Sequence, residues 1–179
     1  MSFVSPFVGA RDGYPSVYVG PYSREGNVPW SNEAAPASAI WIATNRAIYV
    51  PIIVPRACVI RRFWWLNGAT VGTNNLQAGL YDDTFASVLL GTSTLSAGTA
   101  SQVQYDDVTD TPIGSGKYWL ALWCNGTTAT VFRGNPTNAL RLGVFYAQSS
   151  LAAGLPSTAT PASPTTFLPV FGFTTRATP

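Results

Sequence analysis

Short segments rich in β-branched and aromatic residues recur along this chain at intervals of about ten residues. Each is bounded by Gly, Asn, Asp, Ser or Pro, and no stretch longer than a turn has the period of a helix. This spacing predicts an all-β protein, an antiparallel β-sandwich or jelly roll of about 8–10 strands. The expected strands lie within 39–43, 46–55, 58–66, 76–82, 86–94, 101–108, 117–124, 127–133 and 140–148.

The expected strands place the sandwich domain at residues 39–147. Residues 1–38 are dense in Gly, Pro and Ser, which predicts an extended N-terminal arm. Residues 148–166 have the Ser, Thr, Ala and Pro composition of a linker, which tethers a C-terminal β segment at 167–179. A strand tethered in this way can return to its own sheet or add to the edge of a neighbouring subunit.

Aromatic residues are spread along the arm, although a solvated linker has no need of them because their exposure is unfavourable. Two explanations remain open. The arm docks them on another molecule, or it folds back on its own domain. The arm residues that we select as candidate contacts are Phe3, Phe7, Tyr14, Tyr18 and Trp30.

The segment "CVIRRFWWLNGAT" (58–70) does not alternate between apolar and polar residues as a half-buried strand should. In strict alternation, Trp64 shares one face with Cys58 and Ile60. Phe63 and Trp65 share the other face. Because the neighbours of Trp64 on its face are apolar, we predict that Trp64 faces the core and that Phe63 and Trp65 face outward.

The segment "KYWLALWC" (117–124) is also apolar on both faces. Antiparallel sheets normally keep one polar face, so these outer faces must be covered, either by neighbouring subunits or by the arm and tail of the same chain. We favour an oligomer. The interface residues that we predict outside the arm are Phe63, Trp65, Trp119, Trp123, Phe171 and Phe173.

The residues available for chemistry are few. The chain has no histidine, which excludes His-based triads and His metal sites, and we predict no cofactor and no enzymatic activity. Aspartates at the ends of expected strands are typical turn formers, although paired carboxylates can also bind calcium or cleave glycosidic bonds. We retain as weak calcium candidates Asp82, Asp83, Asp106, Asp107 and Asp110.

Charge and cysteine content limit the partners and the compartment. Charged residues make up only 10% of the chain and the net charge is +2, which does not predict binding to nucleic acid or to a membrane. The first residues, "MSFVSPFVGARDG", lack the pattern of a signal peptide, so we expect synthesis in the cytosol. In that compartment Cys58 and Cys124 are expected to be free, buried thiols.

Residues 46–133, about half of the chain, resemble a known family. The aromatic strand ending in Asn67-Gly68, the later "GLYD" and the "GKYWLAL" segment are similar to β-sandwich, jelly-roll-like structural proteins of tailed-phage virions. Such domains occur in capsid decoration proteins, head fibres and tail tips. The resemblance implies a virion location and no catalytic residues.

We therefore expect a non-enzymatic structural virion protein, a capsid decoration or cement protein that stabilises subunit junctions through aromatic contacts and its arm. The expected partners are the major capsid protein or another virion protein, and further copies of the chain in an oligomer, for which we favour a trimer. The alternative is a tail-tip or fibre module that binds carbohydrate or a receptor. It would use Trp64 or Trp65 beside Asn67, Asn74 and Asn75.

Overall fold

The computed structural model describes residues 16–17, 37–54, 56–92, 95–96, 98–134 and 145–177. These residues form strands, turns and loops and contain no helix, which confirms the prediction of an all-β fold. The described strands are β1 (Ser16–Val17), β2 (Ala37–Ile40), β3 (Arg46–Val54), β4 (Cys58–Leu66), β5 (Asn75–Asp82), β6 (Val88–Gly91), β7 (Leu95–Ser96), β8 (Val103–Ile113), β9 (Gly116–Cys124), β10 (Thr130–Arg133), β11 (Phe145–Gln148), β12 (Ser163–Thr165) and β13 (Phe171–Ala177).

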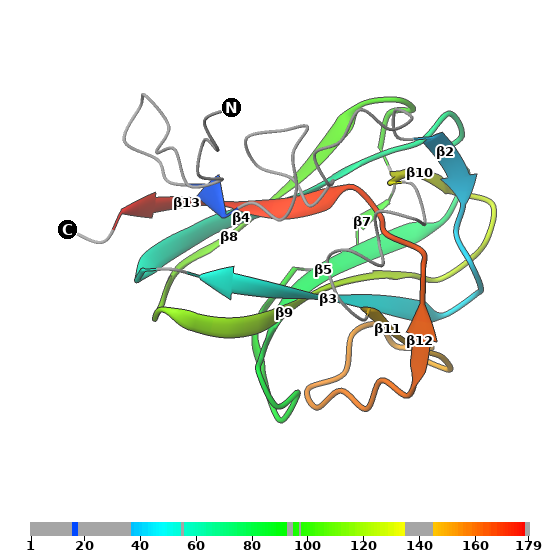
Figure 1. Cartoon of the computed structure of the whole chain (residues 1–179). Coiled ribbons are helices and arrows are strands. Elements are labelled where there is room, and N and C mark those ends of the chain that lie inside the picture. The colour runs from blue at the N-terminus through cyan, green and yellow to red at the C-terminus, as the bar shows by residue number, and fades with distance from the viewer. Residues whose placement is uncertain are drawn as a thin grey trace, which may run out of the picture.

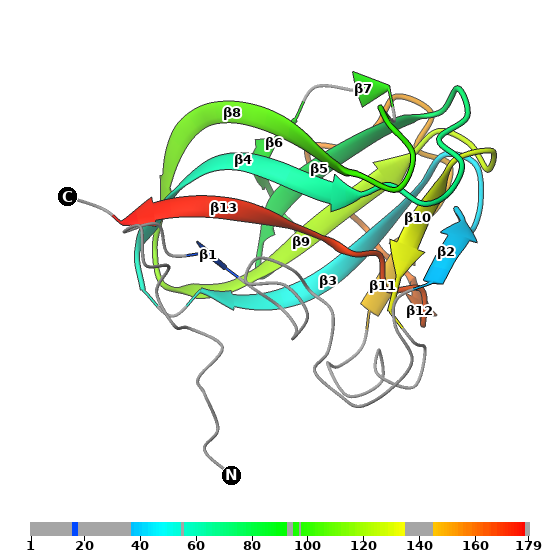
Figure 2. The same ribbon diagram turned by 90° about the horizontal axis from the view of Figure 1, so that it is seen from above.

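The strands form a sandwich of two main antiparallel sheets (Figure 1). One sheet has the order β1-β13-β4-β8, and the other has the order β12-β11-β3-β9-β5-β6, with β7 also paired to β5. A short sheet of β10 and β2 lies at one end (Figure 2). The C-terminal strand β13 pairs with β4 of the same chain, from Phe171↔Trp65 to Ala177↔Cys58. Of the two possibilities that the sequence left open, β13 therefore returns to its own domain and does not add to the edge of a neighbouring subunit.

The observed strand limits differ from the expected ones mainly in length. β8 continues to Ile113, whereas a connection was expected after residue 108, because its residues pair with β4 as far as Cys58. β2 begins at Ala37, inside the segment predicted as arm, and pairs with β10. The short strands β1 and β12 were not expected at all, because two or three paired residues leave no periodic pattern in a sequence.

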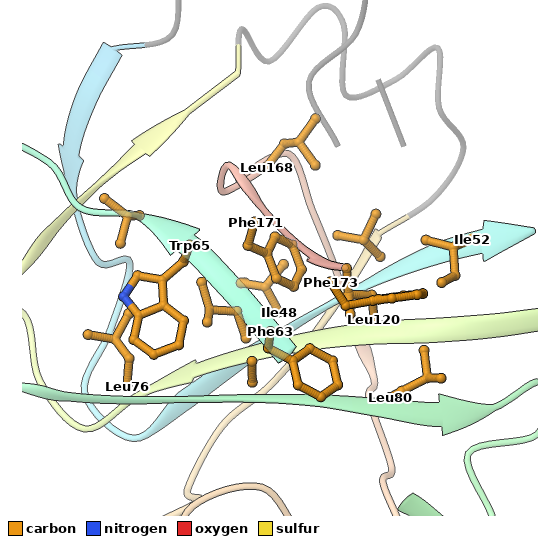
Figure 3. Close-up of a cluster of buried hydrophobic side chains, with 14 of the residues drawn as sticks. Ile48, Ile52, Phe63, Trp65, Leu76, Leu80, Leu120, Leu168, Phe171 and Phe173 are labelled. Carbon is orange, nitrogen blue, oxygen red and sulfur yellow. The ribbon is translucent and has the colours of Figure 1, made fainter. Parts of the chain in front are cut away.

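The hydrophobic core fills the space between the two main sheets (Figure 3). Phe63 and Trp65 from β4 lie beside Phe171 and Phe173 from β13, and the rings of Phe63 and Phe173 meet edge to face with centroids 6.0 Å apart. The opposite sheet contributes aliphatic side chains, among them Ile48, Ile52, Leu76, Leu80 and Leu120. Side chains from both sheets therefore interdigitate as in other β-sandwiches.

The prediction that Trp64 faces the core is wrong, because β4 contains a β-bulge. In the pairing of β4 with β13, the consecutive residues Thr174 and Thr175 lie opposite Arg62 and Ile60, so β4 carries one extra residue, Arg61, at that point. Cys58 and Ile60 face the core before the bulge, and Phe63 and Trp65 face it afterwards. Trp64 consequently lies on the outer face of the four-stranded sheet.

The segment expected to be a linker covers the outer face of the seven-stranded sheet instead. Figure 1 shows this segment, in orange, on the side of that sheet opposite to β4 and β13. Leu151, Leu155 and Ala159 pack against an outer cluster that includes Tyr49 and Trp123. We call residues 149–162 the strap. Its presence explains why the strands below it can be apolar on both faces.

Polar side chains on the sheet hold the strap by bonding to its backbone. The Trp123 Nε1–H donates to the Leu151 carbonyl oxygen at 2.9 Å, and the Tyr81 hydroxyl donates to the Pro156 carbonyl oxygen at 2.5 Å. Gln77 Oε1 accepts from the Leu155 N–H at 2.7 Å. The strap is therefore fixed at three points by side chains of the sheet, two of which, Trp123 and Tyr81, also belong to the outer cluster.

Candidate functional site

Four of the predicted interface residues belong to the core of the same chain. Phe63, Trp65, Phe171 and Phe173 are each 0% exposed. The prediction had placed them in contact with another subunit, and the structure corrects it. The bulge in β4 turns Phe63 and Trp65 inward, and the pairing of β13 with β4 places Phe171 and Phe173 beside them.

The other two predicted interface residues within the sandwich, Trp119 and Trp123, lie on the outer face of the seven-stranded sheet as expected. Trp123 is covered by the strap and is 3% exposed. Trp119 is partly buried; its ring stacks on Phe85 at 4.6 Å between centroids, and its Nε1–H donates to the Asp83 carbonyl oxygen at 3.1 Å. The cover on this face is thus supplied by the chain itself.

The predicted arm contacts Phe3, Phe7, Tyr14, Tyr18 and Trp30 lie outside the described residues.

Asp82 is a turn former. Its Oδ1 accepts hydrogen bonds from the backbone of Thr84 and Ala86 and from the Thr84 hydroxyl, and its Oδ2 accepts from the backbone and hydroxyl of Ser87. These bonds, from the Ser87 and Thr84 side chains above all, lower the pKa of Asp82 to about 2. The turn holds Phe85 at a φ of 61°, over the rings of Tyr49 and Trp119.

The aspartates of β8 do not converge on a common point. Asp107 Oδ1 pairs with Arg62 Nε at 2.7 Å and Asp110 Oδ1 with Arg61 Nε at 3.4 Å. Asp106 points to the other face of the strand, since it lies opposite the core residue Phe63. Within the described part of the chain no group of three or more potential ligands could hold a metal ion. The described fold thus does not bring the five calcium candidates, Asp83 among them, together in one group.

The residues named for a carbohydrate site are occupied elsewhere. The Trp65 Nε1–H donates to Asn67 Oδ1 at 3.0 Å, and both residues are buried. Asn74 Oδ1 accepts from the backbone of Thr128 and Ala129. The Asn75 N–H donates to Asn125 Oδ1 at 2.8 Å, within the connection that follows β9. The Asn67 and Asn74 side chains thus hold neighbouring parts of the same chain, and Trp65 is buried rather than exposed beside them.

The outer face of the four-stranded sheet carries two of the large apolar side chains that are exposed among the described residues, Val103 and Tyr105; the others are Ile40, Ile53 and Leu89. Trp64 lies opposite Tyr105, Leu66 opposite Val103, and Arg62 opposite Asp107, so the side chains form three cross-strand pairs. We call these six residues the β4–β8 face. Tyr105 is 47% exposed and Val103 41% exposed, and the guanidinium carbon of Arg62 lies 5.3 Å from the centre of the Tyr105 ring.

Trp64 is set into the β4–β8 face rather than standing out from it. It is 4% exposed and packs with Val170, Leu66 and Phe132. Its Nε1–H is buried and has no hydrogen-bond partner among the described residues. An indole in this state is unusual, because buried polar groups are normally paired.

Sequence reasoning missed Val103 and Tyr105. The alternation of residues 103–107 could have revealed them. In a strand, Val103, Tyr105 and Asp107 lie on one face, and Gln104 and Asp106 lie on the other. The face became an outer one only through the bulge in β4, which brings Arg62 and Trp64 opposite these residues. The sequence alone gave no sign of the bulge.

Cys58 and Cys124 are free and buried, as predicted. Burial raises the pKa of both thiols, so they remain neutral and unreactive at physiological pH. The residues described here include no helix that is long and apolar enough to cross a bilayer.

Comparison with known proteins does not assign the chain to a family. No protein-family model matches it, no curated protein matches its sequence, and no solved structure matches its fold.

Proposed function

We propose that this protein is a non-enzymatic structural component of a virion that binds protein neighbours through the β4–β8 face. The observation that carries this proposal is the exposure of Val103 and Tyr105 beside Trp64 and Arg62 on one sheet face. Tyr, Trp and Arg dominate the energetics of protein interfaces, because they combine a large apolar area with a polar group.

The described polar side chains support an architectural role. The carboxylate of Asp82 closes a turn, and those of Asp107 and Asp110 form ion pairs with neighbouring arginines. The aromatic residues of the seven-stranded sheet hold the strap. The virion location rests on the resemblance described above, and capsid decoration in a homo-oligomer such as a trimer is the form of the proposal that we favour.

The role of the β4–β8 face can be tested with purified protein by size-exclusion chromatography with light scattering. We expect the unmodified protein to be an oligomer and Tyr105→Ala to weaken its association at least about fivefold, the effect of losing ~1 kcal/mol at an interface. Ile53→Ala is the matched control, because Ile53 is 63% exposed on β3, a strand of the other sheet. A protein that remains monomeric at high concentration would contradict this use of the face.

The virion location is tested separately by mass spectrometry of intact particles. Hundreds of copies per particle would agree with a shell protein, and a handful would place the protein in the tail. Absence of the chain from purified particles would overturn the virion proposal.

A further inference from the structure

The chain contains two Asn-Gly pairs, Asn67-Gly68 and Asn125-Gly126. In such a pair the backbone nitrogen of glycine can attack the side-chain carbonyl carbon of asparagine, because glycine has no Cβ atom to obstruct the approach. Ammonia leaves, and water opens the resulting succinimide to aspartate or isoaspartate. The reaction needs a glycine N–H that can lose its proton, an amide group that can leave, and access of water. The two pairs are alike in sequence, but the fold surrounds them differently.

Asn67-Gly68 is closed to this reaction at each atom involved. The Gly68 N–H donates to the Thr130 carbonyl oxygen at 2.8 Å, so loss of its proton would break that bond. The Asn67 Nδ2 group, which would have to leave, donates to the Thr99 carbonyl oxygen at 3.0 Å. Asn67 is also 1% exposed, which keeps water from its side-chain carbonyl carbon. The fold therefore protects this pair.

Asn125-Gly126 is open at the same atoms. It begins the connection from β9 to β10, in which Asn125 is partly exposed and Thr127 and Thr128 are exposed. Among the described residues, no backbone carbonyl group accepts from the Gly126 N–H, and the Asn125 Nδ2 group donates to no acceptor. The Cys124 thiol donates to the Gly126 carbonyl oxygen at 3.3 Å, but its sulfur is only a weak acceptor for an N–H.

The turn also prepares Asn125 for attack. The Asn75 N–H donates to Asn125 Oδ1 at 2.8 Å, and negative charge develops on this oxygen when the carbonyl carbon is attacked. The Asn125 N–H donates to the Asn75 carbonyl oxygen at 3.2 Å, which holds the backbone at this point. The Asn74 side chain lies against Gly126 and leaves no space for a Cβ atom there. The fold thus requires glycine at the position where glycine makes Asn125 reactive.

We propose that Asn125 is a site of spontaneous deamidation in the folded protein and that Asn67 is protected from it. The Gly126 nitrogen gives its proton to a base in the solvent and forms a bond to Asn125 Cγ, while the Cγ–Nδ2 bond breaks and Nδ2 takes up a proton to leave as ammonia. Water then adds to one of the two carbonyl carbons of the succinimide and opens the ring, without oxidation or reduction.

The product carries one additional negative charge at the end of β9. The isoaspartate form also lengthens the connection from β9 to β10 by one backbone carbon. The proposal concerns the sandwich itself and is independent of the virion assignment.

Peptide mapping of the unmodified protein tests the proposal. The folded protein is incubated at mildly alkaline pH and digested with trypsin, and cleavage after Arg62, Lys117 and Arg133 places the two asparagines in separate peptides. Mass spectrometry then measures the fraction of each that has exchanged its amide for a carboxyl group. We expect Asn125 to react at least about tenfold faster than Asn67, the factor that corresponds to one additional hydrogen bond to be broken.

The same measurement in guanidinium chloride is the matched control. Once the chain is unfolded, both pairs should react at similar rates, because each is then an asparagine followed by glycine in solvent. Equal rates in the folded protein, or a folded protein in which Asn125 does not react, would overturn the proposal. A difference that persists after unfolding would also overturn it, since the cause would then lie in the sequence and not in the fold.

The variant Asn125→Gln provides a second measurement. Glutamine keeps an amide group, but attack by the next backbone nitrogen would need a larger ring, so the reaction is much slower. On ion exchange, the unmodified protein should accumulate an acidic form with time that elutes with Asn125→Asp, and Asn125→Gln should not. Accumulation of this form at the same rate in Asn125→Gln would show that another residue is modified and would contradict the assignment to Asn125.

Discussion

At the scale of single residues, the polar atoms of large aromatic side chains decide where the strap lies. Tyr49, Tyr81 and Trp123 contribute apolar surface to the outer cluster, and each also forms a hydrogen bond at its rim. The Tyr49 hydroxyl donates to Gln148 Oε1, which also accepts from the Thr160 N–H at the end of the strap. An aromatic face that is merely apolar would bind a strap without fixing its position.

Tyr81→Phe tests this role. We expect the free energy of unfolding to fall by about 1 kcal/mol at pH 8, because the Pro156 carbonyl oxygen loses its donor. Chemical denaturation followed by tryptophan fluorescence would measure the loss. Tyr105→Phe is the control, since Tyr105 is exposed on β8, and should change stability by less than about 0.5 kcal/mol.

The same variant should alter the response to alkali. Burial raises the pKa of Tyr81 to about 12 and raises that of Tyr49 as well. The folded state therefore retains protons that the unfolded chain loses above about pH 10, and stability should decrease as the pH rises from 10 towards 12. Tyr81→Phe should show a smaller decrease than the unmodified protein, and an equal decrease would contradict the role of Tyr81.

At the scale of secondary-structure elements, the strap and β4 show what a sequence pattern can and cannot predict. Regular spacing predicted most of the strands, because β-branched and aromatic residues favour the pleated backbone. The bulge in β4 was not predictable, since one residue of "VIRRF" that is extra relative to β13 changes no composition yet reverses the faces of Trp64 and Trp65. Because Trp65 faces the core and Trp64 faces outward, the candidate site is the β4–β8 face and not the surroundings of Trp65.

The strap escaped prediction for a different reason. Its composition is that of a linker, and its hydrogen bonds to the sheet use mainly its backbone groups, which every sequence possesses. The apolar residues that reveal its contact, such as Leu151 and Leu155, are few. What could be inferred correctly was the requirement for a cover, because strands that are apolar on both faces must be covered by something.

Gly154 is the point at which the strap is most sensitive to substitution. Its φ is 101°, a conformation that favours glycine, and a Cβ atom there would lie 2.3 Å from Gln77 Oε1. We expect Gly154→Ala to lower the free energy of unfolding by more than about 1 kcal/mol. It should also increase quenching of tryptophan fluorescence by iodide, because the strap covers Trp123. In Gly91→Ala the added Cβ would have no contact closer than 3.8 Å, so this control should be nearly neutral.

At the scale of the whole molecule, the two sheets act as one unit because β13 inserts Phe171 and Phe173 between them. We expect Phe173→Ala to lower the free energy of unfolding by about 3–5 kcal/mol, the cost of a large cavity in a packed core. Tryptophan fluorescence and far-UV circular dichroism should report the same transition midpoint. Ile53→Ala, at an exposed site, should leave the midpoint almost unchanged. Separate transitions for the two probes would show that the sheets unfold independently.

The position of β13 also determines when this protein can fold during its synthesis. β13 lies between β1 and β4 in its sheet, yet it is made after every other described strand. At about 5–20 residues per second, a ribosome takes roughly 10 s to proceed from β4 to β13. Throughout that interval Phe63 and Trp65 lack the strand that completes their surroundings. The nascent chain must therefore present apolar aromatic surface to the cell, and we expect it to be a client of ribosome-associated chaperones.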